Sequence, residues 1–328
     1  MAAGERIRWG ILGTGRIAAR FAEGLASLPE AELWAVGSRA EDSARAFAAQ
    51  TGAARAYGSY QALVDDPALD VVYVASPHSH HLEHTLLALE AGKAVLCEKP
   101  LALDAGQAQQ MIQRARDHQR FLMEAMWTRF FPLVREALDL IGSGAIGALR
   151  IAAADLGIHR TPQSRPRLFD RALGGGALLD VGVYPVSLAT WLFGQPASVV
   201  STVHIGPHAV DETVAAILGY EQGQLASLYG AITTETPKEA HLLGEAGSIA
   251  IHANFVCPTR LTLRQDGRPA RTIERALTGN GMNYEAEEVM RCLRAGRFES
   301  AIMPLDDSLA AMQTLDRIRA GWSPTGAA

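Results

Sequence analysis

The stretch WGILGTGRIA, residues 9–18, decides the fold, because it places small residues where a β-rich run gives way to a helix. Gly13 permits a tight turn there, and Gly15 lets backbone N–H groups approach a pyrophosphate. Ala18 allows the helix to pack closely on the strand. The spacing alone is weak evidence, and an ordinary turn is the alternative. Its place at the first strand-to-helix turn of an alternating chain favours a dinucleotide-binding site.

The first 124 residues alternate between short β-rich runs and longer segments of helical period, as in a parallel sheet with crossover helices. The strands expected are 7–12, 31–37, 70–75, 94–98 and 121–125, and the helices expected are 16–28, 42–50, 79–91 and about 104–118. We therefore predict an α/β fold in which residues 1–124 form a dinucleotide-binding Rossmann domain.

After about residue 125 glycine-rich apolar runs follow one another with few helices between them, which is typical of an antiparallel sheet. The strands expected are 148–157, 198–206, 213–220 and 223–233, and the helices expected are 183–193, 284–294 and 305–321. We predict that residues 125–328 form an α+β domain for substrate binding and oligomerisation, built on an open-faced, mostly antiparallel sheet. An exposed apolar sheet face would be a natural dimer surface.

The composition is that of an ordinary globular protein and argues against several function classes. With 328 residues, 48% of them hydrophobic, the chain is long enough for about two domains. A formal net charge of −5 leaves no basic excess to neutralise phosphates, so we expect no nucleic-acid or membrane partner. Three widely spaced cysteines favour a reducing cytoplasm over a disulfide framework. We expect neither a signal peptide nor a membrane span of ~20 uninterrupted apolar residues.

The end of the second expected strand, in WAVGSRAED, bears on which dinucleotide is bound. Sites for NAD usually end this strand with Asp or Glu, which binds the ribose 2′-hydroxyl, whereas a nearby arginine accommodates a 2′-phosphate. Ser38 and Arg39 occupy this position and the acids come later, so we predict NADP, with NAD possible. The alternative is that Ser38 only caps a helix and Arg39 is a solvated surface residue.

A histidine-rich turn, ASPHSHHLEH (75–84), follows a later strand at the carboxyl edge, where open α/β sheets bind ligands. We expect some of its histidines to contact cofactor or substrate, and the others can be exposed at a helix start. His80 and His84 could share a helix face and bind a metal. The spacing lacks a matching carboxylate partner elsewhere, so no metal is expected.

The stretch CEKPL (97–101) ends the next strand at the same edge. Pro100 restricts Lys99 to an extended backbone and removes a donor, so the strand stops with the lysine at its end. A lone lysine is usually a surface residue. One that is fixed beside a cofactor can lower the pKa of a neighbouring acid or polarise an oxygen.

The segment GGGALLDVGVYPV (174–186) carries one carboxylate and one phenol among apolar residues. Either Asp180 and Tyr184 are incidental to a buried helix start, or the glycines bring them against a ligand. A helix beginning near Val183 would place Tyr184 in its first turn, where the positive end of the helix dipole favours phenolate.

These motifs, GTGRIA, SPHSHH, EKPL and GG-x-x-x-D-x-G, resemble in this order the Gfo/Idh/MocA oxidoreductase family along nearly the whole chain. Within that family, EAMWTRFFP (124–132) and residues 283–319 are most similar to the dimeric dihydrodiol dehydrogenases, and the NADP-dependent D-xylose dehydrogenases and glucose–fructose oxidoreductases share much of this. The resemblance implies a Rossmann domain followed by an open-faced, mostly antiparallel sheet that mediates oligomerisation, so we expect a homodimer or higher homo-oligomer.

The resemblance also implies roles for single residues. By position, Lys99 is catalytic and Asp180 lies in the substrate pocket. Many members have histidine where Tyr184 stands, whereas tyrosine is what the dihydrodiol dehydrogenase and glucose–fructose oxidoreductase branches show. The family's usual asparagine after the proline of the histidine-rich turn is His78 here. The residues expected at the cofactor are Gly13, Gly15, Arg16, Ile17, Ser38, Arg39, Ser76, Pro77, His81, Glu98, Lys99, Trp127 and Arg129. For the last two, a buried aromatic and a structural arginine are the alternative.

The predicted reaction is reversible oxidation by NADP of a secondary alcohol in a cyclic diol or sugar, such as a trans-dihydrodiol or D-xylose. Tyr184 would remove the hydroxyl proton while hydride passes to the nicotinamide. A free phenol has a pKa near 10, and Lys99 would supply the charge that lowers it. Asp180 would orient the substrate hydroxyl or Lys99. A nicotinamide-dependent glycosidase and a non-enzymatic NADP-sensing regulator are the alternative functions.

Overall fold

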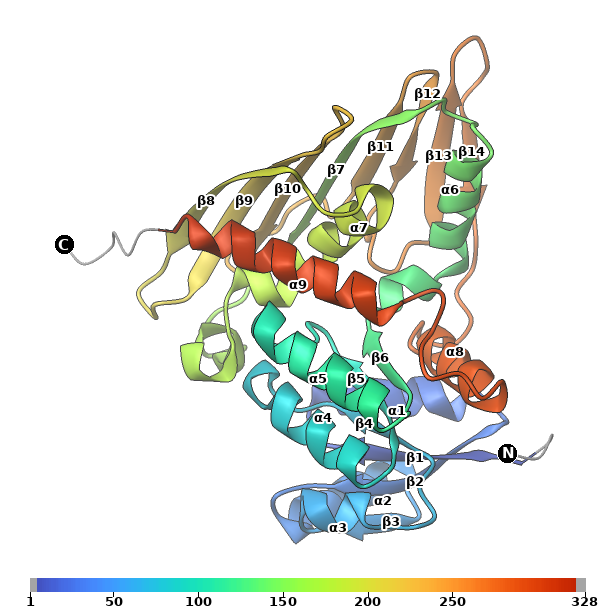
Figure 1. The fold of residues 1–328 in the computed structure, drawn as a ribbon, viewed down its shortest axis with the longest axis vertical. Helices are drawn as coiled ribbons and strands as arrows, with labels where there is room; N and C mark the ends of the chain where they lie inside the picture. Colours follow the sequence, from blue (N-terminus) through green and yellow to red (C-terminus); the bar gives the residue numbers. More distant parts are fainter. Residues whose placement is uncertain (1–4, 323–328) are drawn as a thin grey trace. The chain divides into compact units, whose positions relative to one another are not determined.

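The computed structural model describes residues 5–322, which fall into two compact units (Figure 1). Unit 1 comprises the residues up to Trp127 together with Leu277–Leu305. Unit 2 comprises Thr128–Ala276 and the residues from Asp306 onward. The segment 277–305 thus belongs to the same unit as the N-terminal part of the chain, from which it is far in sequence.

Unit 1 is built on a six-stranded parallel sheet in the order β3-β2-β1-β4-β5-β6. The strands are β1 Ile7–Leu12, β2 Ala31–Gly37, β3 Arg55–Tyr57, β4 Val71–Val74, β5 Ala94–Glu98 and β6 Leu122–Ala125. Every residue of β4, β5 and β6 is buried, as expected where helices cover both faces of a parallel sheet. The predicted Rossmann fold is confirmed. The strand order reverses between β1 and β4, the point at which such sheets bind ligands.

The helices of unit 1 cover this sheet (Figure 1). They are α1 Arg16–Ala26, α2 Glu41–Thr51, α3 Tyr60–Val64, the 3₁₀ turn η1 His78–His80, α4 His81–Glu90, α5 Ala105–Asp117 and α8 Asn283–Arg294. Asp104 caps the N-terminus of α5, because its carboxylate accepts a hydrogen bond from the Gln107 backbone N–H at 2.8 Å. The segment containing α8 is attached through the backbone as well, since Leu122 N–H donates to the Phe298 carbonyl at 3.2 Å.

Unit 2 is built on an eight-stranded sheet in the order β14-β13-β12-β11-β7-β10-β9-β8. The strands are β7 Leu149–Gly157, β8 Ser198–Ile205, β9 Asp211–Gly219, β10 Leu225–Ala231, β11 Ala240–Gly244, β12 Gly247–Ile251, β13 Arg260–Gln265 and β14 Arg271–Glu274. The pair β7–β10 is parallel and the other neighbouring pairs are antiparallel. The prediction of a mostly antiparallel sheet is therefore confirmed, and β11–β14 are additional strands that the sequence did not predict.

One face of the unit 2 sheet is covered by helices (Figure 1). The helical elements of this unit are α6 Pro132–Gly142, the 3₁₀ turns η3 Pro166–Phe169 and η4 Arg171–Leu173, the π-helix η5 Leu178–Gly182, α7 Val183–Phe193 and α9 Leu305–Ala320, preceded at the unit boundary by η2 Trp127–Phe130. The π-helix and α7 contact β7 and β10, and the Ser201 hydroxyl on β8 donates to the Ile318 carbonyl on α9 at 2.7 Å.

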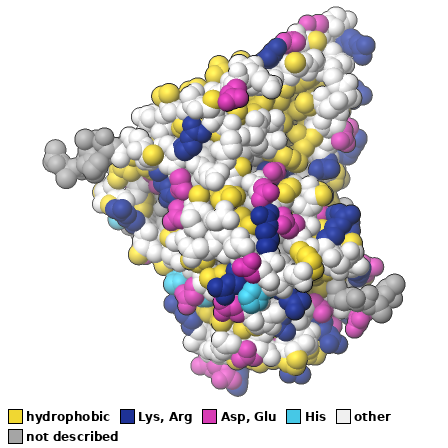
Figure 2. All heavy atoms as spheres, in the orientation of Figure 1, with side chains coloured by type: hydrophobic (Ala, Val, Ile, Leu, Met, Phe, Trp, Pro, Cys, Tyr) yellow, Lys and Arg dark blue, Asp and Glu magenta, His cyan; other side chains and the backbone are white. Residues whose placement is uncertain are grey.

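The opposite face of the same sheet leaves large apolar side chains exposed. The side chains in question are Ile151, Val200, Ile217, Leu225, Tyr229 and Leu243. Strand register brings them together, because Val200 pairs with Ile217, and Ile151 pairs with both Leu225 and Leu243. Figure 2 draws the molecule from the side seen in Figure 1, where acidic and basic side chains are interspersed with hydrophobic ones.

One helical run among residues 5–322, Arg171–Phe193, has the length and hydropathy of a membrane span. Of its most apolar window, 72% is buried inside the protein. The run contains η4, η5 and α7, and its apolar residues pack against the unit 2 sheet. Packing in the core of unit 2 therefore accounts for its hydropathy.

Candidate functional site

The turn after β1 forms an open cradle at the start of α1. Gly13 has a φ of +107°, a backbone conformation that favours glycine, and a Cβ there would lie 3.1 Å from the Ala75 carbonyl oxygen. A Cβ on Gly15 would have no described atom within 4 Å, so this side of the turn is open. Gly15 is the N-cap of α1 and has no side chain to satisfy the first N–H groups, which include those of Arg16 and Ile17. Such N–H groups suit a phosphate.

Ser38 and Arg39 follow β2, the strand that pairs with β1. Ser38 is 8% exposed and Arg39 is exposed. The N-cap of α2 is Ala40, so Ser38 does not have the capping role considered from the sequence. Arg39 acts electrostatically on His84, whose pKa is lowered to about 4 chiefly by burial. It also opposes the burial that raises the pKa of the Tyr60 phenol.

A buried imidazole joins the turns that follow β4 and β5. His81 Nδ1 lies 2.8 Å from the Pro100 carbonyl oxygen, and its Nε2 lies 3.0 Å from the Ser76 carbonyl oxygen. The ring is fully buried, whereas Ser76 and Pro77 are half-buried at the edge of the sheet. His81 therefore fixes the position of both turns relative to each other.

Lys99 is half-buried and follows a buried acid, Glu98. The Lys99 backbone N–H donates to Glu98 Oε2 at 3.2 Å, and the Tyr73 hydroxyl donates to Glu98 Oε1. Glu285, from α8, is fully buried. Burial, and then the charge of Glu98, raise the pKa of Glu285 well above its usual value.

Sequence reasoning missed Tyr73 and Glu285. The signal for Glu285 was its place on the apolar face of α8, where Ala286 and Val289 are also buried. A carboxylate at such a position is unusual enough to be noticed from helical periodicity alone.

The three glycines before Asp180 are required by packing within unit 2. Gly176 has a φ of +114°, and a Cβ there would lie 2.1 Å from Asp211 Oδ1. A Cβ on Gly175 would lie 2.5 Å from the Leu168 carbonyl oxygen. Asp211 in turn accepts a hydrogen bond from Leu178 N–H at 2.5 Å, and burial raises its pKa to about 6. The glycines were expected to allow close approach to a ligand. In the structure they allow close approach to Asp211 and to the backbone of Leu168.

The helix dipole expected to act on Tyr184 is not where the sequence placed it. The π-helix Leu178–Gly182 leads directly into α7, so Tyr184 lies after a helical turn rather than at a free helix start. That prediction was wrong, because the dipole acts within the first turn, which here contains Asp180. Single π-helical turns are common at functional sites, and Tyr184 remains half-buried.

Asp180 forms an ion pair with Arg167 from η3. The Asp180 side chain is 14% exposed and that of Arg167 is 35% exposed. Sequence reasoning missed Arg167, because an isolated arginine in a loop carries no signal of its partner. The pair brings a cation from η3 to the carboxylate of the segment that bears Tyr184.

Trp127 and Arg129 have different surroundings. The Arg20 guanidinium lies over the Trp127 ring, 5.3 Å from its centroid. Arg129 is 1% exposed, pairs with Asp307 at 2.5 Å and lies 4.6 Å from the Trp191 ring centroid. These contacts of Arg129 are those of a structural arginine, and a contact of either residue with the cofactor remains a prediction.

Comparison with protein-family models gives two matches. Residues 7–126 match the model described as an oxidoreductase family with an NAD-binding Rossmann fold, and residues 134–250 match the GFO/IDH/MocA C-terminal domain.

Known proteins similar to this chain are dehydrogenases and reductases. The chain is 37% identical over 327 residues to human trans-1,2-dihydrobenzene-1,2-diol dehydrogenase, covering 95% of this chain and 96% of that protein. A similar solved structure is that of KijD10, a 3-ketoreductase from Actinomadura kijaniata in complex with NADP and TDP-benzene, with a TM-score of 0.87, 29% identity and coverage of 97% and 98%. Another is aldose-aldose oxidoreductase from Caulobacter crescentus with glycerol, with a TM-score of 0.87, 25% identity and coverage of 97% and 99%.

Replacing Gly176→Ala should destabilise unit 2 by about 2 kcal/mol or more, because the new methyl group would strain a positive φ and collide with Asp211. Urea unfolding followed by circular dichroism measures the change. Gly142→Ala is the matched control, since a Cβ on Gly142 would have no described atom within 4 Å. Equal stability of the two variants would contradict the packing role assigned to Gly176.

Proposed function

The chain belongs to the GFO/IDH/MocA oxidoreductase family, and from that premise we propose that it is an NADP-dependent dehydrogenase. It moves a hydride between the nicotinamide and a secondary alcohol of a cyclic diol or sugar. The observation that carries the proposal is the carboxyl edge of the unit 1 sheet, where the open Gly13–Gly15 turn, Arg39 and Lys99 follow β1, β2 and β5.

The choice of NADP rests on the end of β2. An acid at this position binds the ribose 2′-hydroxyl of NAD, and here the position holds Ser38 and an exposed Arg39. The guanidinium can bind a 2′-phosphate through two hydrogen bonds. The structure of KijD10, which was solved in complex with NADP, supports this choice.

The substrate class rests on the relatives. The human relative is named for a cyclic trans-diol, and the Caulobacter crescentus protein for aldoses. Both compounds offer a secondary alcohol next to a second hydroxyl. We infer that this chain acts on such a vicinal diol, either carbocyclic or in a sugar such as D-xylose.

The catalytic roles follow from the side chains available. Bound NADP supplies the hydride acceptor. Tyr184 takes the proton of the substrate hydroxyl, and a phenol with a pKa near 10 needs a cation to do so at neutral pH. Lys99 provides that charge, and each unit by which it lowers the pKa corresponds to ~1.4 kcal/mol. Asp180, held by Arg167, accepts a hydrogen bond from the substrate and orients it.

Tyr184→Phe and Lys99→Met should each lower kcat by about 100-fold or more, because each removes a group that acts on the transferred proton. The measurement is NADP reduction across a panel of cyclic diols and aldoses, with a nitrophenyl glycoside included to detect cleavage without net reduction. Tyr220→Phe is the matched control, since Tyr220 packs on Phe193 at 5.0 Å between ring centroids. Unchanged turnover in both active-site variants would contradict the catalytic roles proposed for Tyr184 and Lys99.

Arg39→Ala should raise KM for NADP by about tenfold or more and leave KM for NAD within about threefold, because only NADP carries the 2′-phosphate that the guanidinium binds. Steady-state kinetics with both cofactors decide this. Arg45→Ala, an exposed arginine of α2 paired with Glu41, serves as the control. An equal effect of Arg39→Ala on both cofactors would rule out the 2′-phosphate contact.

We also infer that the exposed face of the unit 2 sheet is a homodimer surface. Val200 is 70% exposed and Ile217 is 46% exposed, and they are register partners within a larger apolar face. A stable interface buries roughly 800 Å² on each partner, and an eight-stranded sheet face offers an area of that order. Contiguous exposed apolar surface of this kind marks a site of association.

Ile217→Glu should convert a dimer into a monomer, since it would bury a carboxylate within that apolar face, next to Val200. Sedimentation velocity at micromolar concentration measures the change. Phe298→Glu is the control, because Phe298 is 48% exposed but belongs to unit 1. A monomeric wild-type protein, or a dimer that survives Ile217→Glu, would contradict the inference.

A further inference from the structure

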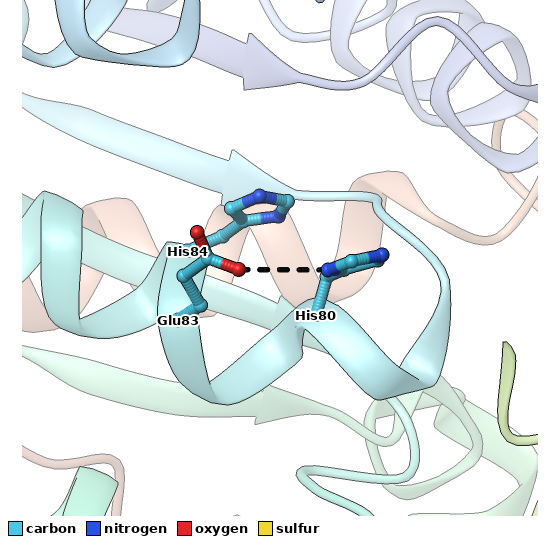
Figure 3. Close-up of side chains that lie close together, drawn as sticks. All are labelled: His80, Glu83 and His84. Carbon is cyan, nitrogen blue, oxygen red and sulfur yellow. Dashed lines mark ion pairs between the residues drawn. The ribbon is translucent and has the colours of Figure 1, made fainter. Parts of the chain in front are cut away.

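Three side chains that the proposed reaction does not use gather at the start of α4 (Figure 3). His80, Glu83 and His84 each offer one ligand atom, and these atoms all lie within 4.8 Å of one another. His80 Nδ1 is 3.5 Å from Glu83 Oε2. The imidazole rings of His80 and His84 stack with their centroids 5.4 Å apart. Residues three and four positions apart share a helix face, which explains the grouping.

The donor set is one that transition metals prefer. Two imidazoles and a carboxylate form the ligand set of several zinc sites. Two donors bound to one zinc ion at about 2.1 Å and a tetrahedral angle are ~3.4 Å apart. The distance of 3.5 Å between His80 Nδ1 and Glu83 Oε2 is already close to this separation. Rotation of exposed side chains can close the remaining distances, because Glu83 is 75% exposed and His80 is 41% exposed.

A second observation points to a ligand at this place. His84 is 7% exposed, and its Nδ1 is buried without a hydrogen-bond partner among residues 5–322. Its ring is held in position by the edge of Tyr60, with centroids 4.6 Å apart. Buried polar atoms normally have a hydrogen-bond partner. The His84 ring is held in place and its Nδ1 has no such partner among the described residues, so it is available to bind a ligand.

We propose that His80, Glu83 and His84 bind one divalent transition-metal ion, with zinc as the best match to this donor set. From the sequence we expected no metal, because we looked for a carboxylate partner elsewhere in the chain. Glu83 lies in the same helical turn as the two histidines and supplies that carboxylate. Three protein donors leave a coordination position for water or an anion. The charges facing the site include that of Arg39, which acts on His84 and weakens cation binding. The site is independent of the proposed function.

Titration of the full chain with Zn²⁺ in a calorimeter tests the proposal, and the visible absorption of bound Co²⁺ gives a second readout. The wild-type protein should bind one equivalent, and zinc should raise its Tm by mass action. His80→Gln and Glu83→Gln change exposed residues, so both variants should fold. Each should weaken binding by about tenfold or more, since loss of a ligand costs at least as much as loss of an outer-shell partner.

His204→Gln is the matched control, because His204 is also exposed and lies 4.0 Å from Glu212 outside this cluster. It should bind zinc as the wild-type protein does. The proposal is overturned if the wild-type protein binds no stoichiometric zinc, or if His80→Gln and Glu83→Gln titrate like the wild-type protein and keep its Tm increase.

Discussion

Both imidazole nitrogens of His81 lie within hydrogen-bond distance of a backbone carbonyl oxygen, and the polar edge of unit 1 depends on this buried ring. Its nitrogens lie 2.8 Å from Pro100 O and 3.0 Å from Ser76 O, which belong to the turns after β5 and β4. A neutral ring donates to one of these oxygens and the imidazolium to both. Because the carboxyl ends of parallel strands meet at one edge, this single buried ring fixes Lys99 relative to the histidine-rich turn. The Glu98 side chain also holds the turn after β5, because it accepts hydrogen bonds from the Lys99 backbone N–H and from the Tyr73 hydroxyl.

The fold of unit 1 could be predicted because its signals are local. Buried parallel strands are continuous apolar runs bounded by glycine and proline, and the predicted strand 94–98 coincides with β5. The hairpins between 240 and 274 were missed because their strands have only four to six residues, too few for a clear alternation. The helix at 283–294 was predicted within one residue. Its place in unit 1 comes from contacts distant in sequence, which periodicity does not encode.

The candidate site divides in the same way. Gly13 and Lys99 could be proposed from the sequence because turn chemistry and proline restrict the backbone within a few residues. Arg167 was not, since pairing with a residue outside its own short element leaves no local pattern, and Glu285 was overlooked although its place on the buried face of α8 is visible in the helical periodicity. The dipole prediction for Tyr184 failed because a π-helical turn precedes α7, and a short apolar segment looks alike as α-helix or π-helix in sequence. Glu83 was overlooked as a candidate metal ligand for the opposite reason. A carboxylate was sought far along the chain, whereas Glu83 lies between His80 and His84 in the sequence.

If the chain transfers a hydride from a carbon that bears a hydroxyl group to the nicotinamide, a label on that carbon must appear in the reduced cofactor. A vicinal cyclic diol deuterated at both carbinol carbons is therefore incubated with NADP, and the recovered cofactor is analysed by mass spectrometry. The proposed function predicts NADPH that carries one deuterium at C4 of the nicotinamide, together with the corresponding hydroxyketone. Oxidised product with unlabelled NADPH, or no net cofactor reduction with any diol or aldose, would contradict it.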